Sequence, residues 1–134
     1  MGADCPDCGV SLVDVPVPAD LRGFAPDEGT VIWCCPRCLR TFPIDVTDSR
    51  ETERDADLPA TVPDGDGGVA LLLLVNLLDS LALNRAAVQS LLDYAEASGT
   101  DVFLALDRLA ADDSVDARVD LARRRRQLES MLDC

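Results

Sequence analysis

Cys5-Pro6-Asp7-Cys8 and Cys35-Pro36-Arg37-Cys38 are the two stretches that decide how the first third of this chain folds. Each is a C-x-x-C motif with proline directly after the first cysteine, and a tight turn of this kind presents two thiolates to one ion. The chain has no histidine, so we expect a shell of sulfurs that leaves the metal no open position. We predict a structural zinc site with these ligands: Cys5, Cys8, Cys35 and Cys38.

Two other cysteines are not expected to bind the metal. Cys34 stands next to Cys35, but pairing Cys34 with Cys38 would give C-x-x-x-C and break the match with the first motif. We therefore expect Cys34 to point to the opposite face of its strand and to act as a small core residue. Cys134, the last residue, is expected to be a free thiol.

Over the first third of the chain, the paired C-P-x-C motifs resemble the zinc-ribbon superfamily, in the type with rubredoxin-like knuckles. The resemblance implies two knuckles at the tips of β-hairpins, with the metal between them. Gly9 fits the pattern after the first motif, whereas Leu39 stands at the matching place after the second. Rubredoxin holds iron in such a site, and Trp33 precedes Cys35 as an aromatic residue does in that family. A rubredoxin-like iron electron carrier therefore stays an alternative to zinc.

Acidic side chains dominate the composition, with 25 Asp and Glu against 12 Arg, no Lys and a formal net charge of −13. This composition resembles proteins of salt-loving archaea, in which a charged, hydrated surface keeps chains soluble at high salt. The Debye length is about 3 Å in 1 M salt, so the charge argues only weakly against nucleic-acid binding. As a whole the chain is similar to short haloarchaeal proteins that join an N-terminal zinc ribbon to a C-terminal helical module, a likeness that implies no activity.

The compartment is expected to be the cytoplasm. The N-terminus lacks the basic, apolar and small-residue pattern of a secretory signal. The longest apolar run, residues 69–75, is far shorter than the about 20 residues that span a bilayer, so no membrane contact is expected. In a reducing setting, paired C-x-x-C motifs indicate metal rather than disulfides.

The pattern of residues predicts an α+β fold. Three strands are expected before Asp45, at Val10–Val17, Thr30–Cys34 and Arg40–Ile44. Residues 46–68 are acidic, carry few apolar side chains and end in a glycine-rich stretch, so they cannot bury enough surface to offset chain entropy. We expect a β zinc ribbon at 1–45, an acidic flexible linker at 46–68 and an all-α bundle of about four helices at 69–134.

Helical periodicity is expected after Gly68. The first helix is apolar nearly all round and should lie at the centre of the bundle, while Asn84 and Thr100 are expected to cap the second and third helices. The expected helices are Val69–Leu83, Asn84–Gly99, Thr100–Asp112, and a fourth from Asp113 or Ser114 to about Leu132. The buried stripe of the second is expected to be Val88, Leu91, Leu92 and Ala95.

Arginines allow a nucleic-acid-binding zinc ribbon as a second alternative. Arg37 and Arg40 flank the second motif, where we expect them to make polar contacts that offset the charge of a zinc–thiolate cluster. Arg123–Arg126 is a basic run, but on a helix four consecutive residues spread around the axis and form no single basic face. Pairing with Asp116, Asp120 and Glu129 is the simpler expectation.

Protein interaction is the function that the sequence favours. The fourth expected helix has two apolar faces, one that enters the bundle and one left for a partner or a second copy of the chain. The first face is Ala117, Leu121, Leu128 and Leu132, and the second is Val115, Val119 and Ala122. No phosphate cradle or nucleophile motif is found, so we expect a non-catalytic adapter or regulatory module with no small-molecule substrate, acting in a high-salt cytoplasm.

Overall fold

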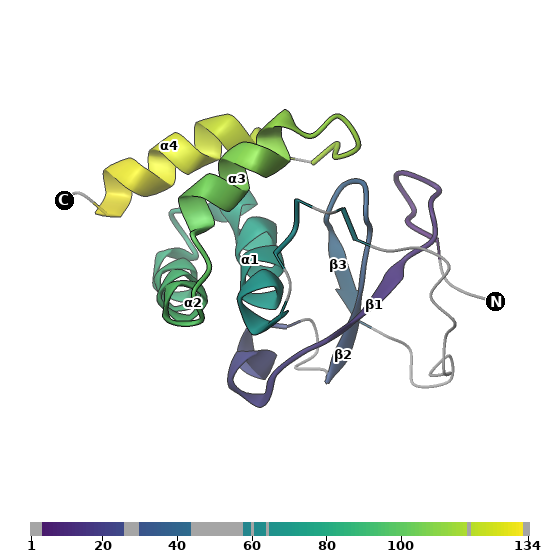
Figure 1. Cartoon of the computed structure of the whole chain (residues 1–134), viewed down its shortest axis with the longest axis horizontal. Coiled ribbons are helices and arrows are strands. Elements are labelled where there is room, and N and C mark those ends of the chain that lie inside the picture. The colour runs from purple at the N-terminus through teal and green to yellow at the C-terminus, as the bar shows by residue number, and fades with distance from the viewer. Residues whose placement is uncertain are drawn as a thin grey trace.

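A three-stranded antiparallel sheet near the N-terminus is followed by helices, so the α+β expectation is confirmed (Figure 1). The computed structural model describes residues 4–25, 30–43, 58–59, 61–63, 65–117 and 119–132. The strands are β1 (Val13–Pro16), β2 (Val31–Cys34) and β3 (Thr41–Pro43). The α-helices are α1 (Gly65–Leu77), α2 (Arg85–Ala97), α3 (Val102–Ala111) and α4 (Leu121–Leu132), and the short 3-10 helices are η1 (Ala19–Phe24) and η4 (Leu78–Ser80).

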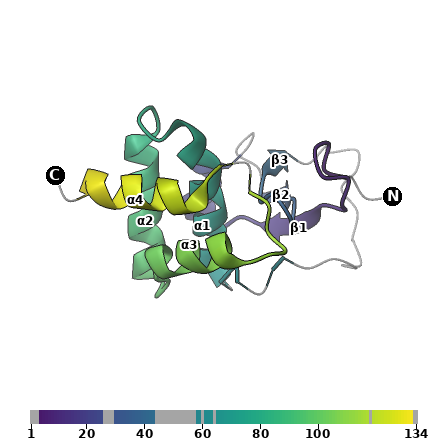
Figure 2. The ribbon, with the colours of Figure 1, turned by 90° about the horizontal axis from the view of Figure 1, so that it is seen from above.

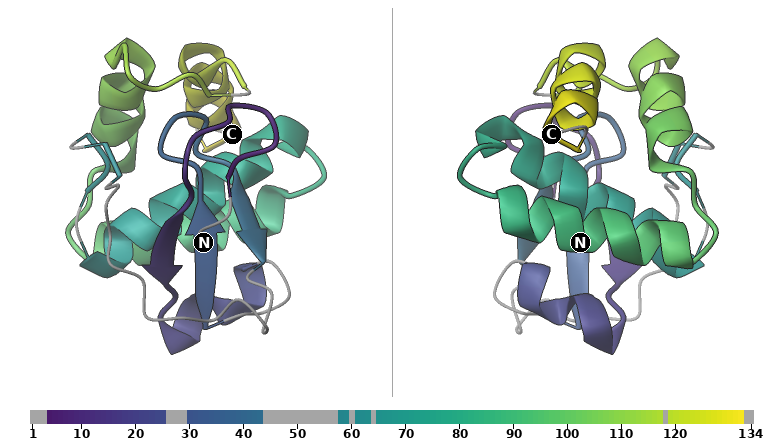
Figure 3. Two further views of the ribbon diagram at one scale, coloured as in Figure 1. Left: turned by 90° about the vertical axis from the view of Figure 1, so that its right-hand side faces the viewer. Right: turned by 90° about the vertical axis from the view of Figure 1, so that its left-hand side faces the viewer.

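The sheet has the order β1-β2-β3 and buries one face. Val13 lies opposite Cys34, and Val15 lies opposite Ile32. Because alternate residues of a strand point to opposite faces, these four share a face, and all four are buried. That face is turned toward α1, which lies between the sheet and α2 (Figure 1). The end-on views show the sheet on one side of the molecule and the helices behind it (Figure 3). The strands are shorter than expected, and Ile44 lies outside the described residues.

Helix α1 begins at Gly65 and ends at Leu77, whereas the expected helix ran from Val69 to Leu83. The glycines that read as the end of a linker form its first turn. A Cβ at Gly68 would overlap the carbonyl of Pro63, and one at Gly67 would overlap the side chain of Thr100. Glycine is therefore needed here for close packing, a reason that composition alone does not reveal.

Helices α2 and α3 follow the predicted pattern with one change of cap. The expected stripe of α2 is buried as a whole, and Gly99 ends the helix with φ +90°. Helix α3 is capped by Asp101, whose carboxylate accepts a hydrogen bond from the Leu104 amide at 3.1 Å, so the expectation of Thr100 was wrong. Asn84 precedes α2, but its side-chain amide donates back to the Ser80 carbonyl at 3.1 Å and leaves the helix start uncapped.

Helix α4 begins at Leu121, later than expected, and this removes the predicted second apolar face. Asp112 accepts hydrogen bonds from the amide and hydroxyl of Ser114, which hold the chain in a turn instead of a helix. Val115 and Val119 lie in the α3–α4 connection and pack against the core. Helices α3 and α4 lie side by side across α1 and α2 (Figure 2).

One hydrophobic cluster contains buried residues of both the sheet and the helices, among them Ile32, Leu39, Leu74 and Leu128. Val62, within the expected linker, is also buried in it. The proposed division into residues 1–45, 46–68 and 69–134 stays a prediction, and much of 46–68 lies outside the described residues. Among the described residues, no helix has the length and apolar character needed to cross a membrane.

Candidate metal centre

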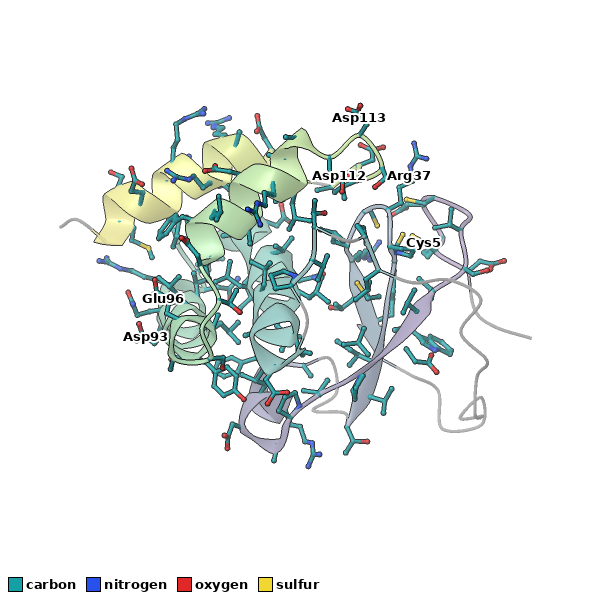
Figure 4. The ribbon with its side chains drawn as sticks, viewed as in Figure 1. Cys5, Arg37, Asp93, Glu96, Asp112 and Asp113 are labelled. Atoms are coloured by element: carbon teal, nitrogen blue, oxygen red, sulfur yellow. The ribbon has the colours of Figure 1, made fainter. Side chains whose placement is uncertain are left out.

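The structure brings together the four cysteines of the two motifs: Cys5, Cys8, Cys35 and Cys38. Their Sγ atoms all lie within 4.8 Å of one another, and those of Cys5 and Cys38 are 3.8 Å apart. A disulfide needs about 2.05 Å, whereas a tetrahedral zinc with Zn–S bonds of about 2.3 Å holds its sulfurs about 3.8 Å apart. The spacing fits a shared metal ion, and Figure 4 shows the sulfurs gathered near Cys5 at one end of the sheet.

Two knuckles of the same shape carry these sulfurs; the first is residues 4–11 and the second is residues 35–40. In the first, the Gly9 amide donates to the Cys5 carbonyl at 2.8 Å; in the second, the Leu39 amide donates to the Cys35 carbonyl at 2.9 Å. Gly9 has φ +72° and Leu39 has φ +64°. Leu39 thus adopts the left-handed backbone that glycine adopts without strain, and the departure from the motif changes the residue but not the turn.

Asn76, on α1, forms hydrogen bonds with the backbone at the end of the second knuckle. Its Nδ2 donates to the Leu39 carbonyl at 2.9 Å, and its Oδ1 accepts from the Thr41 amide at 3.0 Å. Nδ2 also donates to the Leu72 carbonyl at 2.8 Å, within its own helix. Asn76 was not predicted from the sequence to belong to the site. The sequence did offer one signal: Asn76 directly follows the apolar run of residues 69–75. A polar side chain beside such a run needs hydrogen-bond partners when the run is buried.

Burial shapes the ionisation of the site thiols. Cys35 is fully buried and Cys5 and Cys38 nearly so, and burial raises the pKa of Cys38 and, less strongly, that of Cys8. Burial also disfavours the Cys5 thiolate, but hydrogen bonds from the backbone amides of Cys8 and Asp7 outweigh it and lower the pKa of Cys5. A metal that binds here would take the sulfurs as thiolates and release protons.

Cys34 lies in the hydrophobic core and outside the group of four sulfurs. Burial, followed by the charges of Cys35 and Cys5, raises the pKa of Cys34 to about 12. Its Sγ donates to the Cys35 carbonyl at 3.6 Å. Such a thiol is inert, as expected for a core residue; Cys134 lies outside the described residues.

Both arginines of the second knuckle contact carboxylates of this chain. Arg40 Nη1 lies 3.0 Å from Asp7 Oδ2, which joins the two knuckles, and its guanidinium lies 4.9 Å from the centre of the Phe42 ring. Arg37 lies beside the α3–α4 connection (Figure 4). There the Asp116 amide donates to the Arg37 carbonyl at 2.6 Å, and the two side chains lie 4.0 Å apart. The predicted polar contacts are thus intramolecular.

The comparisons with known proteins identify a family without an assigned activity. No curated protein and no solved structure matches the chain, and the resemblance to zinc ribbons stays a prediction. Residues 4–132 match the protein family described as "Family of unknown function (DUF6276)". Since this match covers the cysteine knuckles, the sheet and helices α1 to α4, the chain belongs to the DUF6276 family.

Proposed function

We propose that this protein holds one structural zinc ion in a zinc-ribbon-like N-terminal unit and works as a non-catalytic interaction module. The observation that carries the proposal is the grouping of four free thiols from two distant C-P-x-C motifs, with all Sγ atoms within 4.8 Å. Thiolate is a preferred ligand of zinc, and four of them complete a tetrahedral shell.

The surroundings of the sulfurs support a structural rather than a catalytic ion. Catalytic zinc keeps one position for water or substrate and usually has histidine or carboxylate ligands. The chain contains no histidine. Cys5, Cys35 and Cys38 are each at most 4% exposed, so a substrate would have little access to the ion from their side.

Metal analysis of the protein purified under reducing conditions tests the ion. We expect one zinc per chain and, after replacement by Co²⁺, the absorption bands of a tetrahedral thiolate site. Cys38→Ser should lose the metal, and Cys34→Ser is the matched control, since Cys34 is equally buried and lies next to Cys35 but outside the sulfur group. A metal-free wild type would refute the proposal, and stoichiometric iron with visible colour would favour the electron carrier.

The electrostatics give nucleic-acid binding little support. The two arginines beside the site lie close to Asp7 and Asp116. Within the basic run, Arg125 pairs with Asp107 at 3.1 Å and with Glu129 at 2.8 Å, as was expected for Glu129. Asp120 instead accepts from the Arg123 amide at 3.1 Å, at the start of α4. With a net charge of −13, a surface for phosphates would have to compete with these carboxylates.

Two exposed leucines in the helical part of the chain support protein contact. Leu83, between α1 and α2, is 88% exposed, and Leu104 on α3 is 45% exposed. We propose that the helical part of the chain meets a partner protein or a second copy of the chain. Light scattering in molar salt should give a mass above that of the monomer, and Leu83→Ser or Leu104→Ser should reduce it. A monomeric wild type would exclude self-association.

A further inference from the structure

The second knuckle adopts a turn that its own sequence does not favour. Leu39 occupies the left-handed region at φ +64°, where a side chain crowds the following carbonyl. In the first knuckle Gly9 takes the same position, and an added Cβ there would meet nothing within 4 Å. The loop that carries Cys35 and Cys38 therefore needs support from elsewhere in the fold.

Asn76 provides that support by bonding the backbone on both sides of Arg40, just after Cys38. One end of its amide holds the Leu39 carbonyl at 2.9 Å, and the other end holds the Thr41 amide at 3.0 Å. The hydrogen bond to Leu72, at 2.8 Å, orients the amide on α1. A side chain that is itself fixed can hold a loop in one geometry, which is what orients a metal ligand.

The side chain of Leu39 also ties this loop to α1. The Leu39 side chain is fully buried in the cluster shared with α1. A cavity of about 250 Å³ borders the same contact, between the second knuckle, α1 and the α3–α4 connection. Its lining includes Cys38, Leu39, Asn76 and Val119. The second knuckle is thus held both by the burial of Leu39 and by the hydrogen bonds of Asn76, which lines this pocket.

We propose that Asn76 is a positioning residue for the metal. It holds the Cys35–Cys38 loop in the turn that presents both sulfurs, and so it couples metal binding at the knuckles to the packing of α1. The inference rests on the proposed metal site. Because coupling is reciprocal, an intact α1 contact raises metal affinity, and bound metal in turn stabilises the helices.

Titration of the full-length reduced protein with Co²⁺, followed by Zn²⁺ competition against a chelator, tests this assignment. Asn76→Leu keeps the branched shape and the number of side-chain heavy atoms but removes all three hydrogen bonds; we expect metal affinity to fall by about 10- to 100-fold, the usual effect of losing a residue that orients a ligand. Asn84→Ala is the control, since the Asn84 side chain donates to the carbonyls of Leu77 and Ser80 rather than to the knuckle, and the metal affinity of this variant should equal that of the wild type.

Two further measurements separate positioning from general destabilisation. In a Leu39→Gly background, Asn76→Leu should cost much less affinity, because glycine adopts the turn unaided. Saturating Zn²⁺ should also raise the unfolding temperature of the helical circular dichroism signal less in Asn76→Leu than in the wild type. If Asn76→Leu does not fold, Asn76→Ser, which replaces the amide with a single shorter hydroxyl that cannot bridge Leu39 and Thr41, tests the same hydrogen bonds.

The outcomes distinguish this inference from the proposed function. A wild type that binds no metal refutes the metal site itself. A wild type that binds metal, together with a folded Asn76 variant whose affinity lies within twofold of it, refutes the positioning role alone. Equal losses in the Leu39 and Leu39→Gly backgrounds would also refute it.

Discussion

The two knuckles have the same turn but owe it to different causes. The turn of the first knuckle ends in Gly9, which is exposed and has open space around it. The turn of the second knuckle ends in Leu39, which is fully buried and whose carbonyl is bonded by Asn76. The first turn follows from local sequence, whereas the second follows from the packing of the sheet on α1.

Magnitudes explain why leucine is tolerated at this position. A left-handed residue with a Cβ costs about 1–2 kcal/mol. Burying a leucine side chain contributes about 1.5–3 kcal/mol, and each hydrogen bond of Asn76 adds about 1 kcal/mol. Burial and hydrogen bonding therefore outweigh the backbone strain of Leu39, but only while the helix stays in place.

Metal removal is expected to give the largest difference between the knuckles. Structural zinc contributes about 10–16 kcal/mol in small metal-binding units, and the first knuckle has less packing to replace it. Hydrogen exchange after chelation should therefore rise to the rate of an unfolded chain at the Gly9 amide. At the Leu39 amide it should rise less, because its side chain and Asn76 remain.

The same exchange experiment also tests the division of the chain. Unchanged protection throughout α1 to α4 after chelation would support independent units at 1–45 and 69–134. Faster exchange in α1, the helix in contact with the second knuckle, would instead show that the shared core is cooperative. Equal loss at Gly9 and Leu39 would contradict the comparison between the knuckles.

Acidification should protonate Cys38 before Cys5. The pKa of Cys38 is raised by burial, whereas the pKa of Cys5 is lowered, so Cys38 competes for a proton at higher pH. Metal-bound thiols have depressed pKa values, so the metal-loaded protein is stabilised at neutral pH and loses that stability as pH falls. In the metal-free protein the raised pKa of Cys38 acts in the opposite direction. There the neutral thiol favours the folded state, and this stabilisation is lost as the pH rises above the ordinary pKa of 9.0.

Carbon-13 chemical shifts of the individual cysteine Cβ atoms, recorded on the zinc-loaded protein from pH 8 downward, would follow this order. We expect the shift of Cys38 to leave its thiolate value first. Loss of all four signals at one pH would show that the ion is released in a single step and that the local pKa differences do not matter.

Substitutions at the end of each turn should have an intermediate effect. Leu39→Ala should destabilise the protein by about 2–5 kcal/mol, because it opens a cavity in the core. Leu39→Gly removes the same contacts but relieves the left-handed strain, so it should be less harmful than alanine by about 1 kcal/mol. Gly9→Ala should cost about 1–2 kcal/mol, through backbone strain alone.

Urea unfolding at saturating zinc measures these differences in the free energy of unfolding. The decisive comparison is whether Leu39→Gly is more stable than Leu39→Ala, because at most other positions glycine lowers the free energy of unfolding more than alanine does. A Leu39→Gly variant less stable than Leu39→Ala would show that the left-handed strain is not significant.

The ion pair that joins the knuckles should have the smallest effect. Arg40 and Asp7 meet at 3.0 Å, but their side chains are 39% and 50% exposed. Such pairs contribute about 0–1 kcal/mol and weaken with salt. A double-mutant cycle with Arg40→Ala and Asp7→Asn should give a small coupling in dilute buffer and none in molar salt; a coupling that persists in salt would assign the pair a larger role.

Local patterns predicted much of the molecule. Proline and spacing distinguished Cys35 from Cys34, and the structure groups Cys35 with the other site sulfurs. The apolar stripe of α2 and its stop at Gly99 were also correct. Each of these features depends on residues within a few positions of one another, where spacing and backbone preference act directly.

The errors share one physical reason. The start of α1 depends on the close approach of Gly68 to Pro63, and the late start of α4 depends on the turn that Asp112 stabilises. In both cases the decisive contact is with a particular neighbouring group, and a periodicity of apolar residues carries no information about it.

The sequence by itself determined the sulfur donors, their pairing in two tight turns and the order of sheet and helices, because short-range spacing specifies them. Only the tertiary structure decided how the second turn exists without glycine. Asn76 and Leu39 are 37 positions apart, and their hydrogen bond requires the second knuckle to lie against α1. A left-handed leucine is stable only where burial and a fixed partner offset its strain.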